Sequence, residues 1–150
     1  MTEIQIRPAT ADDAPTIRRM IYRERLDPTA LKWQNFLVAV DGEQVVGIGQ
    51  VKPYPNCREL GSLITAPNYR GQGIAARLIA ALEARTEYPL YLLCEAKMEA
   101  YYQRFGYQTI TWRAAPLALK LKLTPALLLR PFGIRVLVMR KTGIEGNQPR

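Results

Sequence analysis

Hydrophobic and polar residues alternate along short stretches of the chain, and alternation with a period of two is typical of β-strands. Between the apolar stretches 36–40 and 45–51, Asp41-Gly42 is typical of a hairpin turn. Alternation predicts strands over residues 4–7 and 107–112, and we also predict strands over residues 36–40, 45–51, 59–64, 90–94 and 135–140.

Three other stretches have helical spacing or a run of strong helix formers. They predict helices over residues 12–26, 74–83 and 98–104, with Ile17 and Ile21 on one face of the first. The resulting order, β-α-β-β-β-α-β-α-β-β, predicts an α/β fold with a mixed sheet flanked by helices.

The length of 150 residues fits one domain. We therefore predict a single domain over residues 1–141. The residues after it are rich in glycine, proline and polar side chains. Chain ends of this composition are poorly ordered unless they are held by other elements, so we predict a flexible tail over residues 142–150.

The composition restricts the chemistry that the chain can perform. It contains no histidine, which excludes histidine triads, histidine general bases and imidazole metal sites. Its cysteines, Cys57 and Cys94, match no zinc-site spacing and are too few for a disulfide framework. Acid–base chemistry therefore falls to carboxylates, tyrosine, cysteine, lysine or water, and we expect no metal.

The chain is basic, with a formal net charge of +8. This charge favours a polyanionic ligand such as a phosphate-bearing cofactor or a nucleic acid, although a basic surface facing water accounts for it equally well. No apolar run approaches the ~20 residues that cross a bilayer, and the N-terminus lacks the apolar core of a signal peptide. We therefore expect a cytoplasmic protein without a membrane span.

The strongest chemical signal is Arg70-Gly71-Gln72-Gly73-Ile74-Ala75, which follows a predicted strand and opens a predicted helix. The start of a helix leaves backbone N–H groups unpaired and carries the positive end of the helix dipole. Glycine there lets a phosphate group approach the backbone closely. The Walker and three-glycine dinucleotide patterns are both absent. The motif predicts a phosphate-binding turn, and the alternative is a glycine-rich turn without a ligand.

Two segments resemble signatures of the GNAT family of N-acetyltransferases. The segment from Leu63 to Ala75 resembles the pyrophosphate-binding motif, and the segment from Ala100 to Tyr107 is similar to the aromatic-Tyr-x-x-x-Gly-Phe signature, with tyrosine as its last residue. The resemblance implies a splayed sheet that binds acetyl-CoA. Main-chain groups of Leu63, Ile64 and Thr65 would pair with the pantetheine, and Arg70, Gly71, Gln72, Gly73, Ile74 and Ala75 would hold the pyrophosphate.

The resemblance also implies direct transfer of the acetyl group from acetyl-CoA to an amine of a small molecule or a protein. Tyr102 matches the family tyrosine that protonates the departing CoA thiolate, a role that a phenol can fill. Glu59 lies on the strand leading to the motif, where family members often place a general base. The alternatives are a packed aromatic ring for Tyr102 and a surface carboxylate at a strand edge for Glu59.

Residues 114–133, the leucine-rich segment, fit no regular pattern. Leucines recur at every second position from Leu117 to Leu123, as in a strand, whereas the prolines of the segment favour short irregular pieces. One interpretation is a lid over the acceptor, or a basic contact with a partner or a membrane surface. The interpretation that we favour is an arm or helix packed on the domain or on the second subunit of a homodimer.

Two other functional classes fit parts of the sequence. A CoA-binding regulator would keep the fold without catalysis, although the presence of Tyr102 favours an enzyme. A nucleic-acid-binding module would use the positive charge. It is the weaker alternative, because the chain shows neither a helix-turn-helix pattern nor a basic motif with stacking aromatic residues.

Overall fold

The structure, a computed structural model, describes residues 3–127, 133 and 135–143. Most of the tail predicted over residues 142–150 lies outside these residues, as do residues 128–132 of the leucine-rich segment. None of the helices in the described part of the chain is long and apolar enough to cross a membrane.

The chain divides into two compact units, which we describe in turn. The first is formed by the chain up to Lys52 together with Leu60–Glu87. The second is formed by Pro53–Glu59 and the chain from Tyr88 onward. The single domain expected over residues 1–141 stays a prediction.

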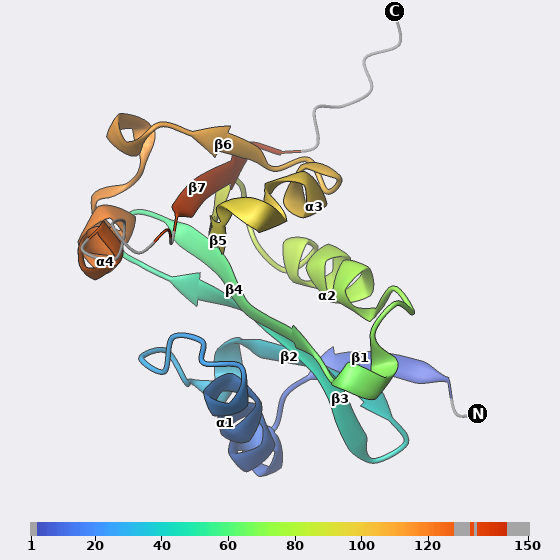
Figure 1. The fold of residues 1–150 in the computed structure, drawn as a ribbon. Coiled ribbons are helices and arrows are strands. Elements are labelled where there is room, and N and C mark those ends of the chain that lie inside the picture. Colours follow the sequence, from blue (N-terminus) through green and yellow to red (C-terminus); the bar gives the residue numbers. More distant parts are fainter. Residues whose placement is uncertain (1–2, 128–132, 134, 144–150) are drawn as a thin grey trace, which may run out of the picture. The chain divides into compact units, whose positions relative to one another are not determined.

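The first unit contains a sheet with a helix on each face. Its elements, in chain order, are β1 (Ile4–Pro8), α1 (Ala14–Arg23), β2 (Phe36–Asp41), β3 (Gln44–Pro53), most of β4 (Arg58–Thr65) and α2 (Ile74–Glu83). The strands lie side by side in chain order, and β2 is antiparallel to both β1 and β3 (Figure 1). The predicted hairpin at Asp41-Gly42 joins β2 to β3.

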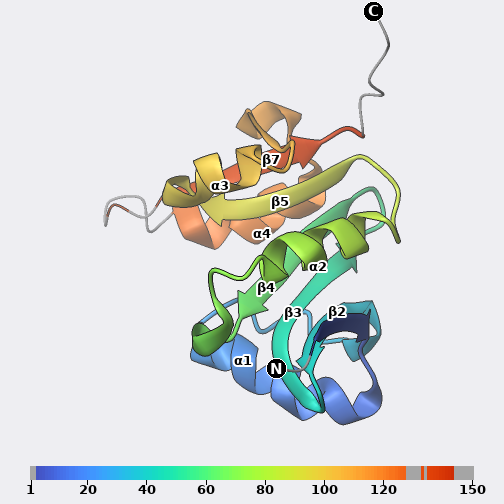
Figure 2. The ribbon, with the colours of Figure 1, turned by 90° about the vertical axis from the view of Figure 1, so that its right-hand side faces the viewer.

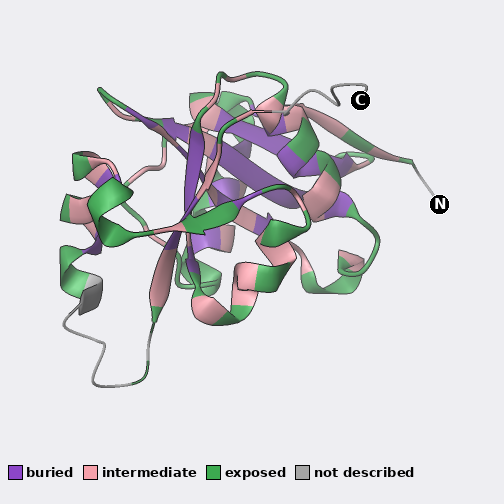
Figure 3. Cartoon of the chain, turned by 90° about the horizontal axis from the view of Figure 1, so that it is seen from above, coloured by how far each residue is buried: buried purple, intermediate pink, exposed green. Residues whose placement is uncertain are grey.

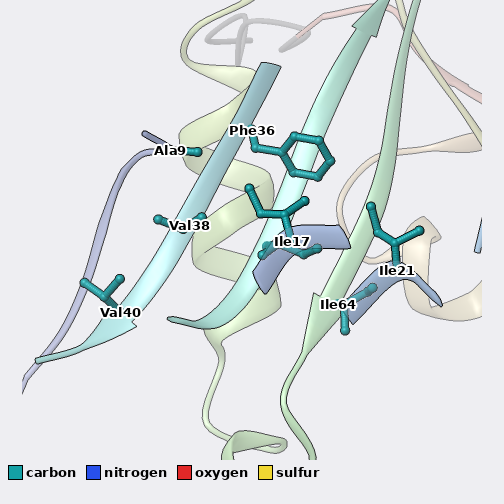
Figure 4. Packing of buried hydrophobic residues seen from close by; sticks show 8 residues of the cluster. Ala9, Ile17, Ile21, Phe36, Val38, Val40 and Ile64 are labelled. Carbon is teal, nitrogen blue, oxygen red and sulfur yellow. The ribbon is translucent and has the colours of Figure 1, made fainter. Parts of the chain in front are cut away.

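Helix α1 covers one face of this sheet because β2 presents a large apolar residue there at every second position. Phe36, Val38 and Val40 pack with Ile17 and Ile21 of α1, and all five side chains are buried (Figure 4). Burying a side chain of this kind stabilises the fold by about 1.5–3 kcal/mol. The predicted apolar face of the first helix is therefore confirmed.

Helix α2 lies against the opposite face of the sheet (Figures 1 and 2). It can approach closely because β3 carries Gly47 where a side chain would collide. A Cβ atom added at Gly47 would lie 3.0 Å from the Ile74 side chain and 3.2 Å from that of Leu78. Ile74 is the first residue of α2, so this contact positions the N-terminus of the helix and the glycine-rich turn before it.

An ion pair holds the start of α1 against the end of β1. The Nη1 and Nη2 atoms of Arg7 donate to the two carboxylate oxygens of Asp13 at 2.7 and 3.1 Å. The same carboxylate accepts the backbone N–H of Thr10 at 2.7 Å. The Arg7 hydrogen bonds lower the pKa of the buried Asp13 carboxyl, against the opposing effect of burial.

Among its described residues, the second unit contains a sheet of three strands and two α-helices. Its elements are β5 (Leu90–Glu95), α3 (Glu99–Gln103), β6 (Gln108–Ile110), α4 (Leu117–Leu127) and β7 (Val136–Lys141). β7 lies between β5 and β6 and is antiparallel to both. Figure 3 shows that buried residues gather on the strands of both units, whereas the helices keep exposed outer faces.

Helix α4 corrects the expectation of short irregular pieces between residues 117 and 127. Alternation at every second position also creates pairs four residues apart, which is close to one helical turn. Leu119 and Leu123 therefore share a face and are buried, whereas Leu117 and Leu121 are 69% and 66% exposed. The favoured interpretation, a helix packed on its own chain, is confirmed, and the homodimer contact stays a prediction.

Candidate active site

The turn between β4 and α2 is shaped by two glycines. Gly71 and Gly73 have φ angles of +79° and +78°, a left-handed conformation that is unfavourable for residues with a side chain. A Cβ atom added at either glycine would meet no atom within 4 Å, so the space around this turn is open. Helix α2 begins at Ile74, directly after the second glycine.

The backbone N–H groups from Gly71 to Ala76 are available to a ligand. In the part of the chain that the structure describes, none of them donates to a protein acceptor. The next N–H along the chain, that of Arg77, donates to the Gly73 carbonyl at 3.1 Å. No side chain caps this end of α2. Unpaired N–H groups and the positive end of the helix dipole together favour an anionic group such as a phosphate.

Contacts within the first unit hold the turn in place. The Tyr69 hydroxyl donates to Oδ2 of Asp41 at 2.7 Å. Arg70 donates from Nη2 to Oε1 of Glu24 and from Nε to the Thr65 carbonyl, both at 3.2 Å. These bonds tie the turn to the hairpin, to the end of α1 and to β4. A turn already ordered in this way loses less conformational entropy when it binds a ligand.

Strand β4 contains a strained residue next to the predicted cofactor-contacting residues 63–65. Ser62 has a φ angle of +52°, which for a residue with a side chain costs about 1–3 kcal/mol and is found preferentially at functional sites. Its buried Oγ accepts a 2.8 Å hydrogen bond from Nε2 of Gln50, which also bonds the Ala30 carbonyl at 2.9 Å. The Ile64 side chain is buried in the core, so only main-chain groups of that residue could contact a ligand.

A cleft of about 840 Å³ opens beside the turn within the first unit. Its volume is in the range of small-molecule sites. It is bounded by α1, by the β2–β3 hairpin and by the end of β4. Of the described residues that the sequence predicted for the site, Ile64 is the one that lines this cleft. Arg19 and Arg23 line it from α1, and neither has an ion-pair partner in the described part of the chain. The lining also includes four carboxylates, those of Asp12, Asp13, Glu24 and Glu43, so the cleft presents charges of both signs.

Tyr102 lies on α3 in the second unit, half-buried among aromatic rings. Its ring meets those of Tyr101 and Tyr107 edge-on, with centroids 5.2 and 6.4 Å away. Burial, with a smaller effect from Cys94, raises the pKa of Tyr102 to about 12. Its hydroxyl has no hydrogen-bond partner among the residues described. It is thus protonated at neutral pH and available as a donor.

Glu59 lies at the start of β4, in the part of this strand that belongs to the second unit. Only 3% of the residue is exposed, so the alternative of a surface carboxylate is wrong. The Tyr54 hydroxyl donates to Oε2 at 2.8 Å, and Nζ of Lys122 lies 3.1 Å from Oε1 and 3.0 Å from Oε2. We call these three residues the Glu59 cluster.

The structure brings the motif residues Leu63–Ala75 together in the first unit, whereas Glu59 and Tyr102 belong to the second. No hydrogen bond or ring contact joins Glu59 to Tyr102 in the described part of the chain. Sequence analysis missed Tyr54 and Lys122. Lys122 lies 63 residues from Glu59 along the chain, so no local pattern could indicate this pair. The described residues include no group of three metal-ligating side chains.

A family model matches the part of the chain that contains both sequence signatures. Its description is "Acetyltransferase (GNAT) domain", and it matches residues 32–109 of the 150. No curated protein matches the chain.

Several solved structures share the fold. N-acetylglutamate synthase from Neisseria gonorrhoeae, complexed with coenzyme A and N-acetyl-glutamate, has 16% identity and a TM-score of 0.74, over 95% of this chain and 35% of that one. Rv2747 from Mycobacterium tuberculosis, in complex with CoA, has 16% identity and a TM-score of 0.73, over 93% and 99% of the two chains. Ard1 from Thermoplasma volcanium has 12% identity and a TM-score of 0.68, over 95% and 99%.

These likenesses confirm the predicted fold class, an α/β fold with a mixed sheet flanked by helices. The chain spans only about a third of the length of the Neisseria synthase. At such low identities the likeness concerns the fold, whereas the match to the family model concerns the sequence itself.

Proposed function

Because this chain belongs to the acetyltransferase (GNAT) domain family, we propose that it transfers an acetyl group directly from acetyl-CoA to an amine. The observation that carries the proposal is the row of unpaired N–H groups at the start of α2. This turn lies inside the region that the family model matches. The structures of the Neisseria synthase and of Rv2747, which were solved with coenzyme A, support the choice of donor.

The turn fits the pyrophosphate of acetyl-CoA in charge and in shape. Its N–H groups from Gly71 to Ala75 would each offer a hydrogen bond to a phosphate oxygen. No side chain of Gly71 or Gly73 stands in the way. Two donors of Arg70 are already engaged with Glu24 and Thr65, so its contact with a phosphate would use the remaining N–H groups.

The main chain of Leu63, Ile64 and Thr65 would pair with the pantetheine. A strand can hold a ligand in this way when its N–H and C=O groups are not all used by neighbouring strands. The left-handed conformation of Ser62 interrupts the regular strand just before these residues. This interruption is consistent with a change in the direction of the β4 hydrogen-bonding groups at that position.

Tyr102 would assist departure of the CoA thiolate by donating its hydroxyl hydrogen. With a pKa of about 12, this phenol is a weaker acid than a thiol, whose pKa is near 8.5. Complete proton transfer to the thiolate would therefore be uphill by about 5 kcal/mol. We infer that Tyr102 stabilises the developing negative charge through a hydrogen bond, and that transfer of the proton follows only if bound substrates lower its pKa.

Glu59 would accept the proton that the amine must lose before it attacks the thioester. An alkyl ammonium group with a pKa near 10 carries this proton at neutral pH. A general base can accept this proton only when the two groups lie about 2.6–3.2 Å apart. Lys122 Nζ lies 3.0–3.1 Å from the Glu59 oxygens, so the carboxylate can hold an ammonium group at this distance.

The experiment that tests the proposal is calorimetric titration of acetyl-CoA into the wild type and a Gly73→Asp variant. The substitution puts a carboxylate at the turn, where a phosphate should bind. Gly42→Asp is the matched control, because Gly42 is also a left-handed glycine with open space around it but lies in the β2–β3 hairpin. Circular dichroism checks that all three proteins are folded.

We expect micromolar binding that Gly73→Asp abolishes and Gly42→Asp retains. An amine screen with release of free CoA as the readout then tests catalysis. Binding without turnover of any amine would favour the alternative of a CoA-binding regulator. No binding by a folded wild type would refute the proposed function.

A further inference from the structure

The Glu59 cluster joins a buried carboxylate to a primary ammonium group of the same chain. Nζ of Lys122 lies within hydrogen-bond distance of both carboxylate oxygens, and the Tyr54 hydroxyl supplies a third bond. The side chain of Glu59 is 4% exposed, whereas that of Lys122 is 22% exposed. The Glu59 carboxylate is therefore almost inaccessible to solvent, whereas the Lys122 side chain that pairs with it is partly exposed to solvent.

The fold positions Lys122 through its neighbours on α4. Leu119 and Leu123 are buried together with Tyr91 and Val138, which anchors the helix to the sheet of the second unit. This anchoring does not depend on the lysine head group, which is attached through four flexible methylene groups. The ammonium group could leave the carboxylate by rotation of its own side chain while the helix stays packed.

We propose that Glu59 and Tyr54 form a binding site for a primary alkylammonium group, which Lys122 fills in the free protein and which an acceptor amine enters by displacing the Lys122 side chain. The proposal rests on the function proposed above and adds an internal competitor for the acceptor amine. Lys122 then acts as a built-in competitor of the acceptor. Once it is displaced, the amine stands where Glu59 can take its proton.

The chemistry of the cluster selects the acceptor. A primary ammonium group has three N–H donors and can bond both oxygens of Glu59 at once, as Lys122 does. A tertiary ammonium group has one donor, and a quaternary group has none. Exchange of one ammonium group for another also keeps the buried carboxylate paired, which avoids the large cost of an isolated buried charge.

Tyr54 remains a donor throughout this exchange. Burial, together with the hydrogen bond to Glu59, raises the pKa of Tyr54 to about 12, so its hydroxyl is protonated at neutral pH. It holds Oε2 of Glu59 in place while the ammonium partner changes. The site thus keeps one fixed donor and one exchangeable donor.

The first arm of the test is chemical rescue of a Lys122→Ala variant. This substitution removes three methylene groups and the ammonium group, a fragment equal to n-propylammonium. We would measure the melting temperature with n-propylammonium or trimethylammonium chloride at equal ionic strength. Lys120→Ala is the matched control, because Lys120 lies on the same helix and donates to the Arg113 carbonyl instead of to a carboxylate.

We expect n-propylammonium to raise the melting temperature of Lys122→Ala by several degrees and to leave the wild type and Lys120→Ala unchanged. Trimethylammonium should have no effect. Adding Glu59→Gln to Lys122→Ala should abolish the rescue. Equal responses to the two cations would overturn the proposed site and make the contact an ordinary structural ion pair.

The second arm measures acetyl transfer to n-propylamine. Without the internal competitor, the KM of Lys122→Ala for this acceptor should fall about tenfold relative to the wild type and Lys120→Ala. Lys122→Gln, which keeps a donor near Glu59 but removes the charge, replaces the alanine variant if that variant does not fold. An unchanged KM in a folded, active variant overturns the proposal.

The two proposals can fail separately. If n-propylammonium rescues Lys122→Ala but the wild type does not bind acetyl-CoA, the ammonium site is upheld and the acetyltransferase function is refuted.

Discussion

The Tyr69 hydroxyl donates a 2.7 Å hydrogen bond to the Asp41 carboxylate and so ties the glycine-rich turn to the β2–β3 hairpin. This hydrogen bond raises the pKa of Tyr69, as expected when the neutral phenol is the donor to an ionised acceptor. The residues lie 28 positions apart in the sequence. The bond is therefore a tertiary contact that orders the turn before a ligand arrives.

Replacing Tyr69 with phenylalanine tests whether this ordering of the turn contributes to the affinity for acetyl-CoA. We expect Tyr69→Phe to weaken acetyl-CoA binding by about threefold to tenfold while the protein stays folded, because the ligand must then order the turn itself. Calorimetric titration measures the change. Tyr22→Phe is the control, since Tyr22 is 59% exposed on α1. Equal affinities of Tyr69→Phe and the wild type would show that the tether does not support the site.

The raised pKa of Tyr102 makes a prediction about the rate at alkaline pH. The phenol stays protonated until the pH nears 12, so its ionisation should cause no loss of kcat between about pH 8 and pH 10. Tyr102→Phe should lower kcat by about 10²-fold and leave the Kd for acetyl-CoA unchanged. A pH–rate profile of both proteins checks this. An alkaline loss of rate below pH 10 that disappears in Tyr102→Phe would contradict the prediction.

The ion pair of Arg7 with Asp13 predicts how stability depends on acid. The folded-state pKa of Asp13 is lowered, so the ion pair contributes its full stabilisation above the unfolded-state pKa of about 3.9. This stabilisation is lost as the pH falls through the folded-state pKa. Asp13→Asn should reduce the free energy of unfolding by about 1–2 kcal/mol at pH 7.

The difference between Asp13→Asn and the wild type should shrink towards pH 2, where the carboxyl group is increasingly protonated. Urea denaturation at several pH values measures it. Asp12→Asn is the control, because Asp12 is adjacent but exposed. A difference that stays constant with pH would mean that lost packing, not lost charge, accounts for the effect.

The two faces of α4 predict opposite results for two leucines. Leu119→Ala should lower the free energy of unfolding by about 2–5 kcal/mol, because it leaves a cavity in a fully buried site. Leu121→Ala removes a side chain that is 66% exposed and should change it by less than about 0.5 kcal/mol. Denaturant unfolding compares the two directly. Similar losses in both variants would indicate that the outer face of α4 is covered in solution.

The glycine-rich turn could be predicted from the sequence because its chemistry is local. A strand, two glycines and a helix start follow each other within a few residues, and the backbone alone supplies the N–H donors. The same holds for the hairpin at Asp41-Gly42 and for the strands with alternating patterns. In these cases neighbouring residues carry the pattern that predicts the element, although tertiary contacts such as Tyr69 with Asp41 also hold the turn.

The conformation of the leucine-rich segment could not be decided locally. Its alternating leucines fit a strand or a helix. Burial of Leu119 and Leu123 against the sheet of the second unit favours the helix. The surroundings of Glu59 are likewise a tertiary result, since Lys122 approaches from a distant helix. By itself the sequence determined the family signatures and the glycine-rich turn before α2. Only the tertiary structure decided which charges are paired, because such pairing depends on distances that chain order does not set.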